Sequence, residues 1–453
     1  MSNLMSLLGM GAGGIAAQNS GIAVATNNVA NANTEGYSRE TVSLEALIGP
    51  PLAGGVRAGD TSRYASELLA SRMRTASGSL ASSTASQSAI SDLESALTSG
   101  TTIDTRFATL FSKIAQASAT PTDTVARDAV VQATRDLVTS INGQAADISD
   151  ARHGADLRIG DNVPQASQLA QQLADANKQV AKTNDPTALD KRDQLANQLS
   201  QLVGGSARID KDGKMRFVLD NGAVLVDGVH AATLTSALDP LTGYQKVSVV
   251  DGAMTRDVTS SLGGKLGADL TFRDSTAKTA ADALDRLAYD AANAFNGTHA
   301  TNAALDGSLG HSMFIAPFVV TGAAAALKID TTLDADSDNL ALAGPGTAPG
   351  DNTGGMALYA LATANVASGG TEKLTDAATG IIGKLGLAGA EAKSDVDRDS
   401  MVADNLAGLR DSLSGVDTQE ELTNLARFEH ASSAMTKFVS TIDDLLTGLI
   451  QAL

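Results

Sequence analysis

The chain has 453 residues, a formal net charge of −18 and no cysteine. The acidic balance argues against nucleic-acid binding, which needs a basic surface to release counterions from phosphates, and the lack of cysteine excludes disulfides and thiolate metal sites. An apolar fraction of 43% is enough for a packed core, while an aromatic content of only 3% favours slim helical packing over a bulky enzyme core.

The N-terminal residues do not resemble a cleaved secretory signal. Residues 1–30 have no basic start, and glycines interrupt their apolar part. No window approaches the run of about 18 apolar residues that a membrane span needs. Taken alone, these features predict a cytoplasmic protein without membrane contact. They fit equally well a protein that is exported by a route that reads no cleaved signal.

Both ends of the chain carry the same apolar pattern, an alternation of three- and four-residue steps that predicts a coiled-coil seam. The steps fall on Leu4, Leu8, Gly11, Ile15, Gln18, Ile22, Ala25 and Val29 at the N-terminus and on Leu425, Phe428, Ser432, Met435, Val439, Ile442, Leu446, Leu449 and Leu453 at the C-terminus. A narrow seam on a single helix cannot bury itself. We therefore expect the two ends to pack against each other or against other copies.

Helical patterns dominate the first half of the chain. After a turn-rich run at 27–37, an extended stretch reaches a breaker at Gly49-Pro50-Pro51, and helix is expected again over residues 60–99. A short amphipathic helix is centred on residues 107–114.

The next helix is predicted to start at Pro121 and Asp123. Gly160 and Pro164 interrupt its pattern, and Asn184-Asp185-Pro186 ends it. A last helical piece then runs from Leu189 to Val203.

Between about 205 and 262 the apolar period changes from helical to strand-like. Asn221-Gly222, Asp227-Gly228 and Asp251-Gly252 lie between alternating apolar residues, which is the strongest short-range hairpin signal. Helix is expected again over 275–295. A loop-rich stretch then extends to Gly355, and a charged helix over 388–413 precedes the terminal seam.

These patterns predict a mainly α fold with inserted β structure. We expect the N- and C-terminal helices to pair as a coiled coil beside a long-helix bundle domain and a small β-rich inserted domain. The predicted parts are a terminal coiled-coil domain (1–35 with 416–453), a helical domain (36–204 with 263–300 and 356–415), a β-rich domain (205–262), and a loop-rich insert or part of the outer domain (301–355).

Two motif-like patterns have simpler explanations than ligand binding. Gly9, Gly11 and Gly14 satisfy G-x-G-x-x-G, but no strand precedes them, so close backbone packing is far more plausible than a dinucleotide site. Residues 334–338 begin like a calcium loop, yet Asn339 stands where that loop needs glycine. We expect a solvated acidic loop there, and we predict no catalytic, cofactor-binding or metal-binding residues anywhere in the chain.

The start of the last helix carries ordinary helix-forming signals. Asp417 is a plausible N-cap after the break at Gly415. Glu420 and Glu421 lie in the first turn, where acidic side chains complement the helix dipole.

One run carries more information than its local structure requires. Residues 26–39, TNNVANANTEGYSR, would on physical grounds be a helix end and a turn. The run closely resembles the N-terminal signature of bacterial flagellar rod, hook and hook-associated axial proteins. The residues that carry the resemblance are Asn27, Asn28, Val29, Ala30, Asn31, Asn33, Thr34, Gly36, Tyr37 and Arg39. The closing segment from Ser414 to Asp443 is similar to the last helix of the same family, although Arg427–Ser433 departs from its usual text.

Interior segments narrow the resemblance to the FlgK type of hook-associated protein. Residues 189–195 (LDKRDQL) and 263–274 (GGKLGADLTFRD) are similar to segments of that type, and Ala348–Asn352 fits it as well. The resemblance implies a secreted subunit of the hook–filament junction in the bacterial flagellum. Such a subunit is transiently cytoplasmic, leaves unfolded through the flagellar type III export channel, and folds its termini into an inner tube on assembly.

The same resemblance implies a set of partners. They are other copies in a ring, the hook protein, a second junction protein of the hook-associated protein 3 type and an export chaperone on the C-terminal helix, with no nucleic acid and no membrane. The leading hypothesis is a structural adaptor without enzyme activity. A hook or distal-rod protein is the alternative, and an enzyme or ligand-binding protein with coiled-coil ends is a remote one that would need a clustered polar pocket.

Overall fold

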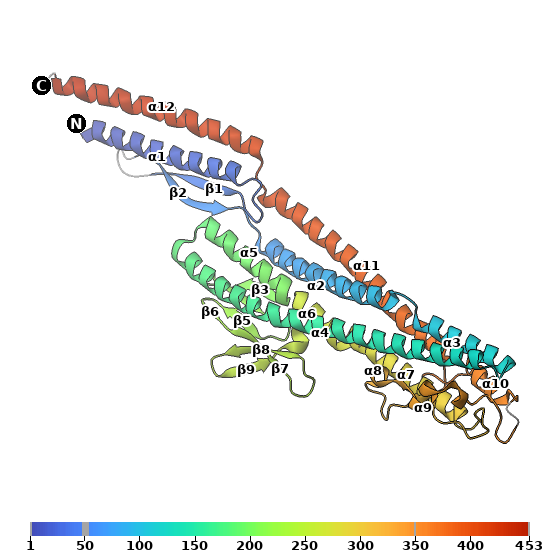
Figure 1. Ribbon diagram of the computed structural model, residues 1–453. Coiled ribbons are helices and arrows are strands. Elements are labelled where there is room, and N and C mark those ends of the chain that lie inside the picture. The colour runs from blue at the N-terminus through green and yellow to red at the C-terminus, as the bar shows by residue number, and fades with distance from the viewer. Residues whose placement is uncertain (1, 48–53, 348–349, 452–453) are drawn as a thin grey trace.

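The computed structural model describes residues 2–47, 54–347 and 350–451 and shows an elongated molecule whose two ends lie side by side (Figure 1). Helix α1 (Ser2–Ala30) packs against helix α12 (Thr418–Gln451). An antiparallel ribbon of β1 (Glu40–Ala46) and β2 (Val56–Arg63) lies along α1. We call α1, β1, β2 and α12 the terminal body.

Long helices form the stem of the molecule. They are α2 (Glu67–Thr98), α3 (Ile103–Ala119), α4 (Thr124–Thr183), α5 (Pro186–Val203) and α11 (Leu374–Ser414). Helix α2 packs along α11, and α4 packs against α3 and α5. The predicted start and end of α4 are confirmed, because Asp123 accepts a hydrogen bond from the Val125 backbone N–H (3.0 Å) and Asn184 adopts a left-handed conformation.

The expected interruption at Gly160 and Pro164 is wrong, because α4 continues through both residues for 60 residues. Ile159 and Val163 beside the proline are almost completely buried against the β-rich part of the chain. Their burial outweighs the cost of about 3 kcal/mol that a proline brings to a helix interior.

The expected helix over 60–99 also begins later than predicted. Residues 60–63 belong to β2 and pair with β1, and α2 starts at Glu67, where Ser66 Oγ accepts from the Leu69 N–H (3.4 Å). The pairing of β2 with β1 is a nonlocal contact that helix periodicity cannot report. The breaker at Gly49-Pro50-Pro51 lies outside the described residues.

The β-rich module contains two small antiparallel sheets on α4 and α5. One has the order β3-β4-β5-β6 (Ser206–Ile209, Met215–Val218, Val224–Asp227, His230–Ala231) and the other the order β7-β8-β9 (Thr233–Leu238, Gln245–Asp251, Met254–Asp257). The predicted hairpin turns are confirmed: Gly222, Gly228 and Gly252 have φ of +80°, +60° and +56° between paired strands. Buried Phe217 and Leu225 contribute to the core that this module shares with α4 and α5.

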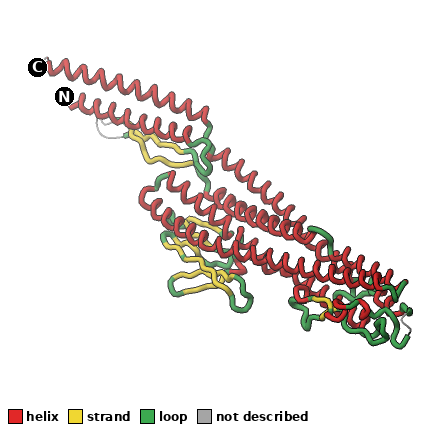
Figure 2. Tube along the Cα trace, in the orientation of Figure 1, coloured by secondary structure: helices red, strands yellow, loops and turns green. Residues whose placement is uncertain are grey.

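The return of the chain toward the far end is more helical than expected. A 3₁₀ turn (Thr259–Ser261), α6 (Gly264–Thr271) and a π-helical turn (Phe272–Thr276) lead into α7 (Ala277–His299). Short elements then form a distal insert: β10 (Phe314–Ile315), α8 (Ala323–Ala326), β11 (Lys328–Ile329), α9 (Thr331–Ala335), a 3₁₀ turn (Ser337–Asn339) and α10 (Thr353–Ala360). Figure 2 shows the strands grouped beside α1, in the β-rich module and in this insert.

Two buried polar side chains fasten the distal insert to the stem. The Arg127 guanidinium is 1% exposed and donates to the carbonyl oxygens of Pro121 (2.6 Å) and Leu340 (2.8 Å). The His299 ring hydrogen-bonds through Nδ1 to the His311 carbonyl oxygen (2.5 Å), while Nε2 accepts from the Ala341 N–H (2.9 Å). The Nε2 atom is therefore unprotonated, and the ring is neutral.

We expect the distal insert to lose stability in acid through His299. Burial lowers the pKa of His299 below its ordinary value of 6.5. Just below pH 6.5 the unfolded chain therefore binds a proton at this ring while the folded chain does not. This contribution is complete above about pH 6.5 and is lost as the pH falls through the lowered pKa. Nitrogen-15 NMR of labelled histidine should show the His299 ring still neutral at pH values below 6.5, its ordinary pKa. Uptake of the proton by His299 at or above pH 6.5 would contradict this account.

Candidate functional site

One face of α1 is built from residues without large side chains. Gly11, Gly14, Ala17, Gly21 and Ala25 are its buried residues along that stretch. A Cβ atom on Gly21 would lie 2.8 Å from the Phe428 ring, one on Gly14 would lie 3.3 Å from Met435 Sδ, and one on Gly11 would collide with Val439. The contacts advance along α1 as they go back along α12, so the two helices are antiparallel. The glycine pattern near the N-terminus therefore serves close helix packing.

The predicted seam shares Gly11 and Ala25 with this small-residue face, whereas its large side chains are less buried. Leu4, Leu8, Ile15, Ile22 and Val29 are half-buried. On α12 the half-buried set is Leu425, Phe428, Met435 and Val439, the buried set is Ile442 and Leu446, and Leu449 is 42% exposed. Leu453 lies outside the described residues. Large side chains on α12 thus face glycines on α1, and the large side chains of the predicted α1 seam are only half-buried.

Asn28 lies at the end of this helix pair, where a polar joint begins. The side chain is 1% exposed. Its Nδ2 donates to the Glu40 carbonyl oxygen (2.9 Å) and to Glu421 Oε2 (3.0 Å), and its Oδ1 accepts from the Glu40 N–H (2.9 Å) and the Tyr37 hydroxyl (2.8 Å). One amide therefore binds α12 and the start of β1 to the end of α1.

Arg39 completes the contact with α12, and Tyr37 supports Asn28. The Arg39 guanidinium donates to Glu421 Oε1 (2.8 Å) and Glu420 Oε1 (2.6 Å) and lies 5.7 Å from the centre of the Tyr64 ring. Burial, assisted by the charges of Glu40 and other nearby carboxylates, raises the pKa of Tyr37 well above its ordinary value. The Tyr37 hydroxyl consequently stays protonated and can donate to Asn28.

Glu421 has a second role that its position in the first helical turn did not predict. It is 3% exposed and accepts from both Asn28 and Arg39. Only the long-range pairing of α12 with α1 brings these donors to it. The predicted N-cap at Asp417 is confirmed by its bond from the Gln419 N–H (2.9 Å).

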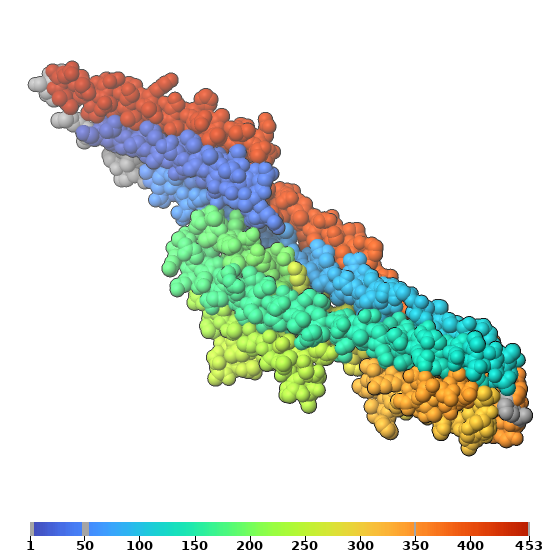
Figure 3. Space-filling model, viewed as in Figure 1, coloured from blue at the N-terminus to red at the C-terminus, as the bar shows by residue number. Residues whose placement is uncertain are grey.

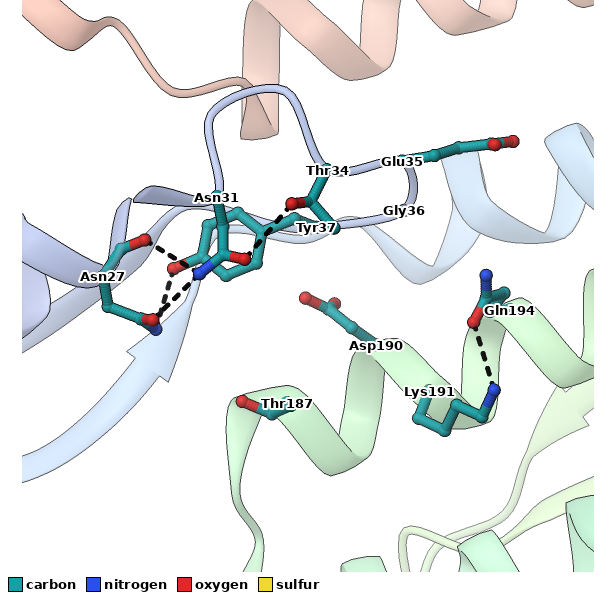
Figure 4. A pocket seen from close by; sticks show the side chains of 10 residues that line it. All are labelled: Asn27, Asn31, Thr34, Glu35, Gly36, Tyr37, Thr187, Asp190, Lys191 and Gln194. Atoms are coloured by element: carbon teal, nitrogen blue, oxygen red, sulfur yellow. Dashed lines mark hydrogen bonds between the residues drawn. The ribbon is translucent and has the colours of Figure 1, made fainter. Parts of the chain in front are cut away.

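Four more signature residues, Asn27, Asn31, Thr34 and Gly36, line a cavity of about 260 Å³ beside α5 (Figure 4). Asn31 Nδ2 donates to Asn27 Oδ1 (2.9 Å), Thr34 Oγ1 donates to Asn31 Oδ1 (3.2 Å), and Gly36 makes the turn with φ of +83°. Val29 is half-buried, whereas Ala30 and Asn33 are exposed. These polar groups mainly satisfy one another, so they shape the turn.

Two acidic residues of the LDKRDQL segment contact the same joint from α5. Asp190 accepts from the Ser38 N–H and hydroxyl (2.9 Å each) and forms an ion pair with Arg63. Arg63 also donates to Asp193 (2.6 Å). The sequence shows an i, i+3 acidic pair on a helix, but the partners are Ser38, just before β1, and Arg63 at the end of β2. The resemblance of the segment to a known family was the only signal that could have singled it out.

The acidic run 334–338 spans the end of α9 and the following 3₁₀ turn, so the expected loop is partly helical. Asp334 pairs with Arg135, and Asp336 Oδ1 accepts from the Asp338 N–H (2.9 Å). Within the described residues, no three His, Asp or Glu side chains converge as a metal-ion site would require. In the same residues, no helix combines the length and apolar character needed to cross a membrane.

Comparison with known proteins first defines the class of the chain. Residues 8–37, which include most of α1 and the signature turn, match the family model described as flagella basal body rod protein. The chain therefore has the N-terminal element of flagellar axial proteins. Residues 90–314, from α2 to the distal insert, match the helical domain of flagellar hook-associated protein FlgK.

Relatives over the whole length agree with these matches. Flagellar hook-associated protein 1 of Bacillus subtilis (strain 168) is 26% identical over 97% of this chain and 96% of its own. Flagellar hook-associated protein 1 of Escherichia coli (strain K12) is 24% identical over 99% of this chain and 100% of its own. The flagellar hook junction protein FlgK from Burkholderia pseudomallei has the same fold, with a TM-score of 0.68 and 15% identity over 76% of this chain and all of its own. The chain belongs to the FlgK type of flagellar hook-associated proteins, which gives it a structural role in the flagellum.

The small-residue face predicts opposite effects for two glycine substitutions in α1. Gly21→Ala should weaken the pairing with α12, because its Cβ would meet the Phe428 ring, whereas Gly9→Ala meets nothing within 4 Å. The latter should stabilise the helix by up to about 1 kcal/mol. Hydrogen exchange of α1 amides should show lower protection for Gly21→Ala and higher protection for Gly9→Ala. Equal effects would show that α12 does not lie against Gly21.

Asn28 and Asn33 provide a matched pair within the signature. Asn28→Ala leaves the buried Glu421 carboxylate and the Glu40 backbone short of partners, and we expect the joint to lose about 2–5 kcal/mol. Exposed Asn33→Ala should change little. The readout is hydrogen exchange at the Arg39 and Tyr64 amides, which bond to Ser414 and Arg39 carbonyl oxygens across the joint. Unchanged protection in Asn28→Ala would contradict the central role of this amide.

Proposed function

We propose that the chain is a structural subunit of the hook–filament junction that is exported unfolded and assembles through its terminal helices. The observation that carries this proposal is the antiparallel α1–α12 pair at one end of an elongated molecule. Apolar side chains remain exposed on the pair, including Met5 (60%), Leu422 (51%), Leu445 (56%) and Ile450 (65%). An exposed apolar surface of this kind suits burial against neighbouring subunits.

The absence of enzyme activity is part of the proposal. At the cavity beside the signature turn, Asn27, Asn31 and Thr34 bond to one another, Asp190 is paired with Arg63, and Lys191 donates to Gln194. We therefore assign these groups to shaping the turn and propose no catalytic role for them. The match of residues 90–314 to the FlgK helical domain favours this role over that of a hook or distal-rod protein.

We further propose the partners that the family resemblance implies. They are other copies in a ring, the hook protein, a second junction protein of the hook-associated protein 3 type, and an export chaperone on α12. The exposed apolar residues of α12 suit a helix-in-groove contact with such a chaperone. The signature and seam residues are proposed as the assembly residues, and the four-part division given above as the domain organisation.

Removal of either terminal helix should abolish attachment of the filament. A chain without residues 1–29 or 422–453 keeps both buried apolar clusters, which lie between Ala89 and Ala392. It should therefore stay folded and monomeric, while cells that carry it should make hooks without retained filaments in electron micrographs. The full chain with exposed Asp404→Ala is the control and should retain filaments. Filament attachment by either truncated chain would refute the assembly role of the helices.

A further inference from the structure

An uncharged, apolar loop projects from the distal insert between β10 and α8. Residues 312–327 contain no Asp, Glu, Lys or Arg, although charged residues make up 19% of the chain. Within this run the side chain of Phe318 is fully exposed, and that of Val319 is exposed beside it. The Gly322 N–H donates to Asp285 of α7 (2.7 Å), which fixes the end of the loop to the stem. An exposed aromatic side chain on an uncharged, anchored loop is typical of a contact with another protein surface.

A groove of about 470 Å³ lies between α2 and the later part of α11. It remains open because α11 presents Val402 and Leu406 to it, whereas α2 presents only small side chains on that wall besides Arg72. These small residues are Ser71, Thr75, Ala76 and Ser79. The groove therefore has apolar walls that the two helices do not fill by themselves.

An apolar strip leads from this groove toward the terminal body. Val402, Leu406, Leu409 and Leu413 are spaced by four, three and four residues, so they share one face of α11. Leu406 is half-buried and the other three are exposed. The strip ends just before the break at Gly415, after which α12 begins. The groove is thus continuous with the helix through which we propose that the chain assembles.

Charge restricts where two copies of this chain can approach each other. Each copy has a formal net charge of −18, and like charges that face each other across an interface are unfavourable. On α2 the run Leu68–Ser91 contains Arg72 and Arg74 but no Asp or Glu. Asp399, which borders the groove on α11, is paired with Arg398 (3.0 Å). The uncharged loop can therefore approach this wall of α2 without meeting an unpaired carboxylate on it.

The loop and the groove lie on opposite sides of the stem. Figures 1 and 3 show the distal insert on one side of α4, and α2 with the later part of α11 on the other side. The loop of one copy can therefore reach the groove only of another copy. A contact between two different patches repeats from copy to copy and closes a ring when the rotation between copies fits.

We propose that the loop of one copy docks in the α2–α11 groove of a second copy, with Phe318 as its anchor. In this contact the Phe318 ring lies against Val402 and Leu406, and Arg72 at the rim of the groove faces the ring. Aromatic and arginine side chains commonly carry most of the binding energy of an interface. The contact deepens the proposed function and rests on it, because it presupposes a ring of copies in the junction.

The absence of native cysteine allows the contact to be tested by cross-linking in purified flagella. The full chain with Val319→Cys and Val402→Cys keeps Phe318 and places one thiol on each of the two patches. A short bismaleimide should join neighbouring chains into dimers and larger multiples of the chain mass on immunoblots. Val319→Cys alone should give no such ladder. Neither should Val319→Cys with Val125→Cys, an exposed position at the start of α4.

A second experiment tests Phe318 itself. Phe318→Asp should reduce the number of filaments retained after shear, counted in electron micrographs, by at least about tenfold. The melting temperature of the purified full chain should not change, because this side chain is fully exposed. Leu241→Asp makes the same change at another almost fully exposed apolar residue, in the turn between β7 and β8, and should retain filaments.

Three results would each overturn the contact. They are the lack of a ladder in flagella that retain their filaments, a ladder from Val319→Cys alone, and equal filament loss in Phe318→Asp and Leu241→Asp. The proposed function fails on a different result, namely filament attachment by a chain that lacks a terminal helix. The two failures are therefore distinguishable.

Discussion

Glycine at positions 11, 14 and 21 leaves part of α1 without side chains, and the close approach of α12 to that face determines how the two ends of the chain meet. Phe428, Met435 and Val439 fill the space that the glycines leave. Packing of this kind gives shape-specific contact with modest apolar burial. Because α1 and α12 are antiparallel, the chain must leave this pair and return to the same place, so α2 and α11 also run side by side.

The residues that make the sequence recognisable gather where parts of the molecule meet. Asn28 and Arg39 bind α12, Tyr37 donates to Asn28, and Asp190 accepts from Ser38, just before β1. The GGKLGADLTFRD segment likewise contacts other parts of the molecule. Gly264, with φ of +57°, lies against the Gln201 backbone of α5, and Arg273 pairs with Asp156 of α4. Arg273 also stacks 5.1 Å from the Tyr244 ring centre. Contacts between different parts of the molecule account for these side chains.

Local signals in the sequence predicted local structure well. Asp123, Asn184 and Asp417 mark helix ends because capping involves only neighbouring backbone groups. The turns at Asn221-Gly222 and Asp251-Gly252 were predictable because only glycine easily adopts their positive φ. The predicted mainly α fold, with paired terminal helices and inserted β structure, is confirmed as well.

Features that depend on distant partners could not be predicted in the same way. The helix through Pro164 persists because it packs on strands that follow it in the chain, and β2 exists because β1 pairs with it. The apolar pattern on α1 correctly includes Gly11 but otherwise follows large side chains such as Ile15 and Ile22, so it misses Gly14 and Gly21, which lie against α12. The partners of Asp190 and Glu421 come from other elements, and no spacing in the sequence connects them.

Disulfide formation in purified flagella tests the arrangement of the two ends most directly, because the chain has no cysteine of its own. A chain with Gly14→Cys and Met435→Cys places the two thiols where the structure brings these positions into contact. The account predicts a cross-link within a single chain for this pair and none for Gly14→Cys with Phe428→Cys. A cross-link in the second pair, or only between different chains in the first, would contradict the antiparallel pairing of α1 with α12.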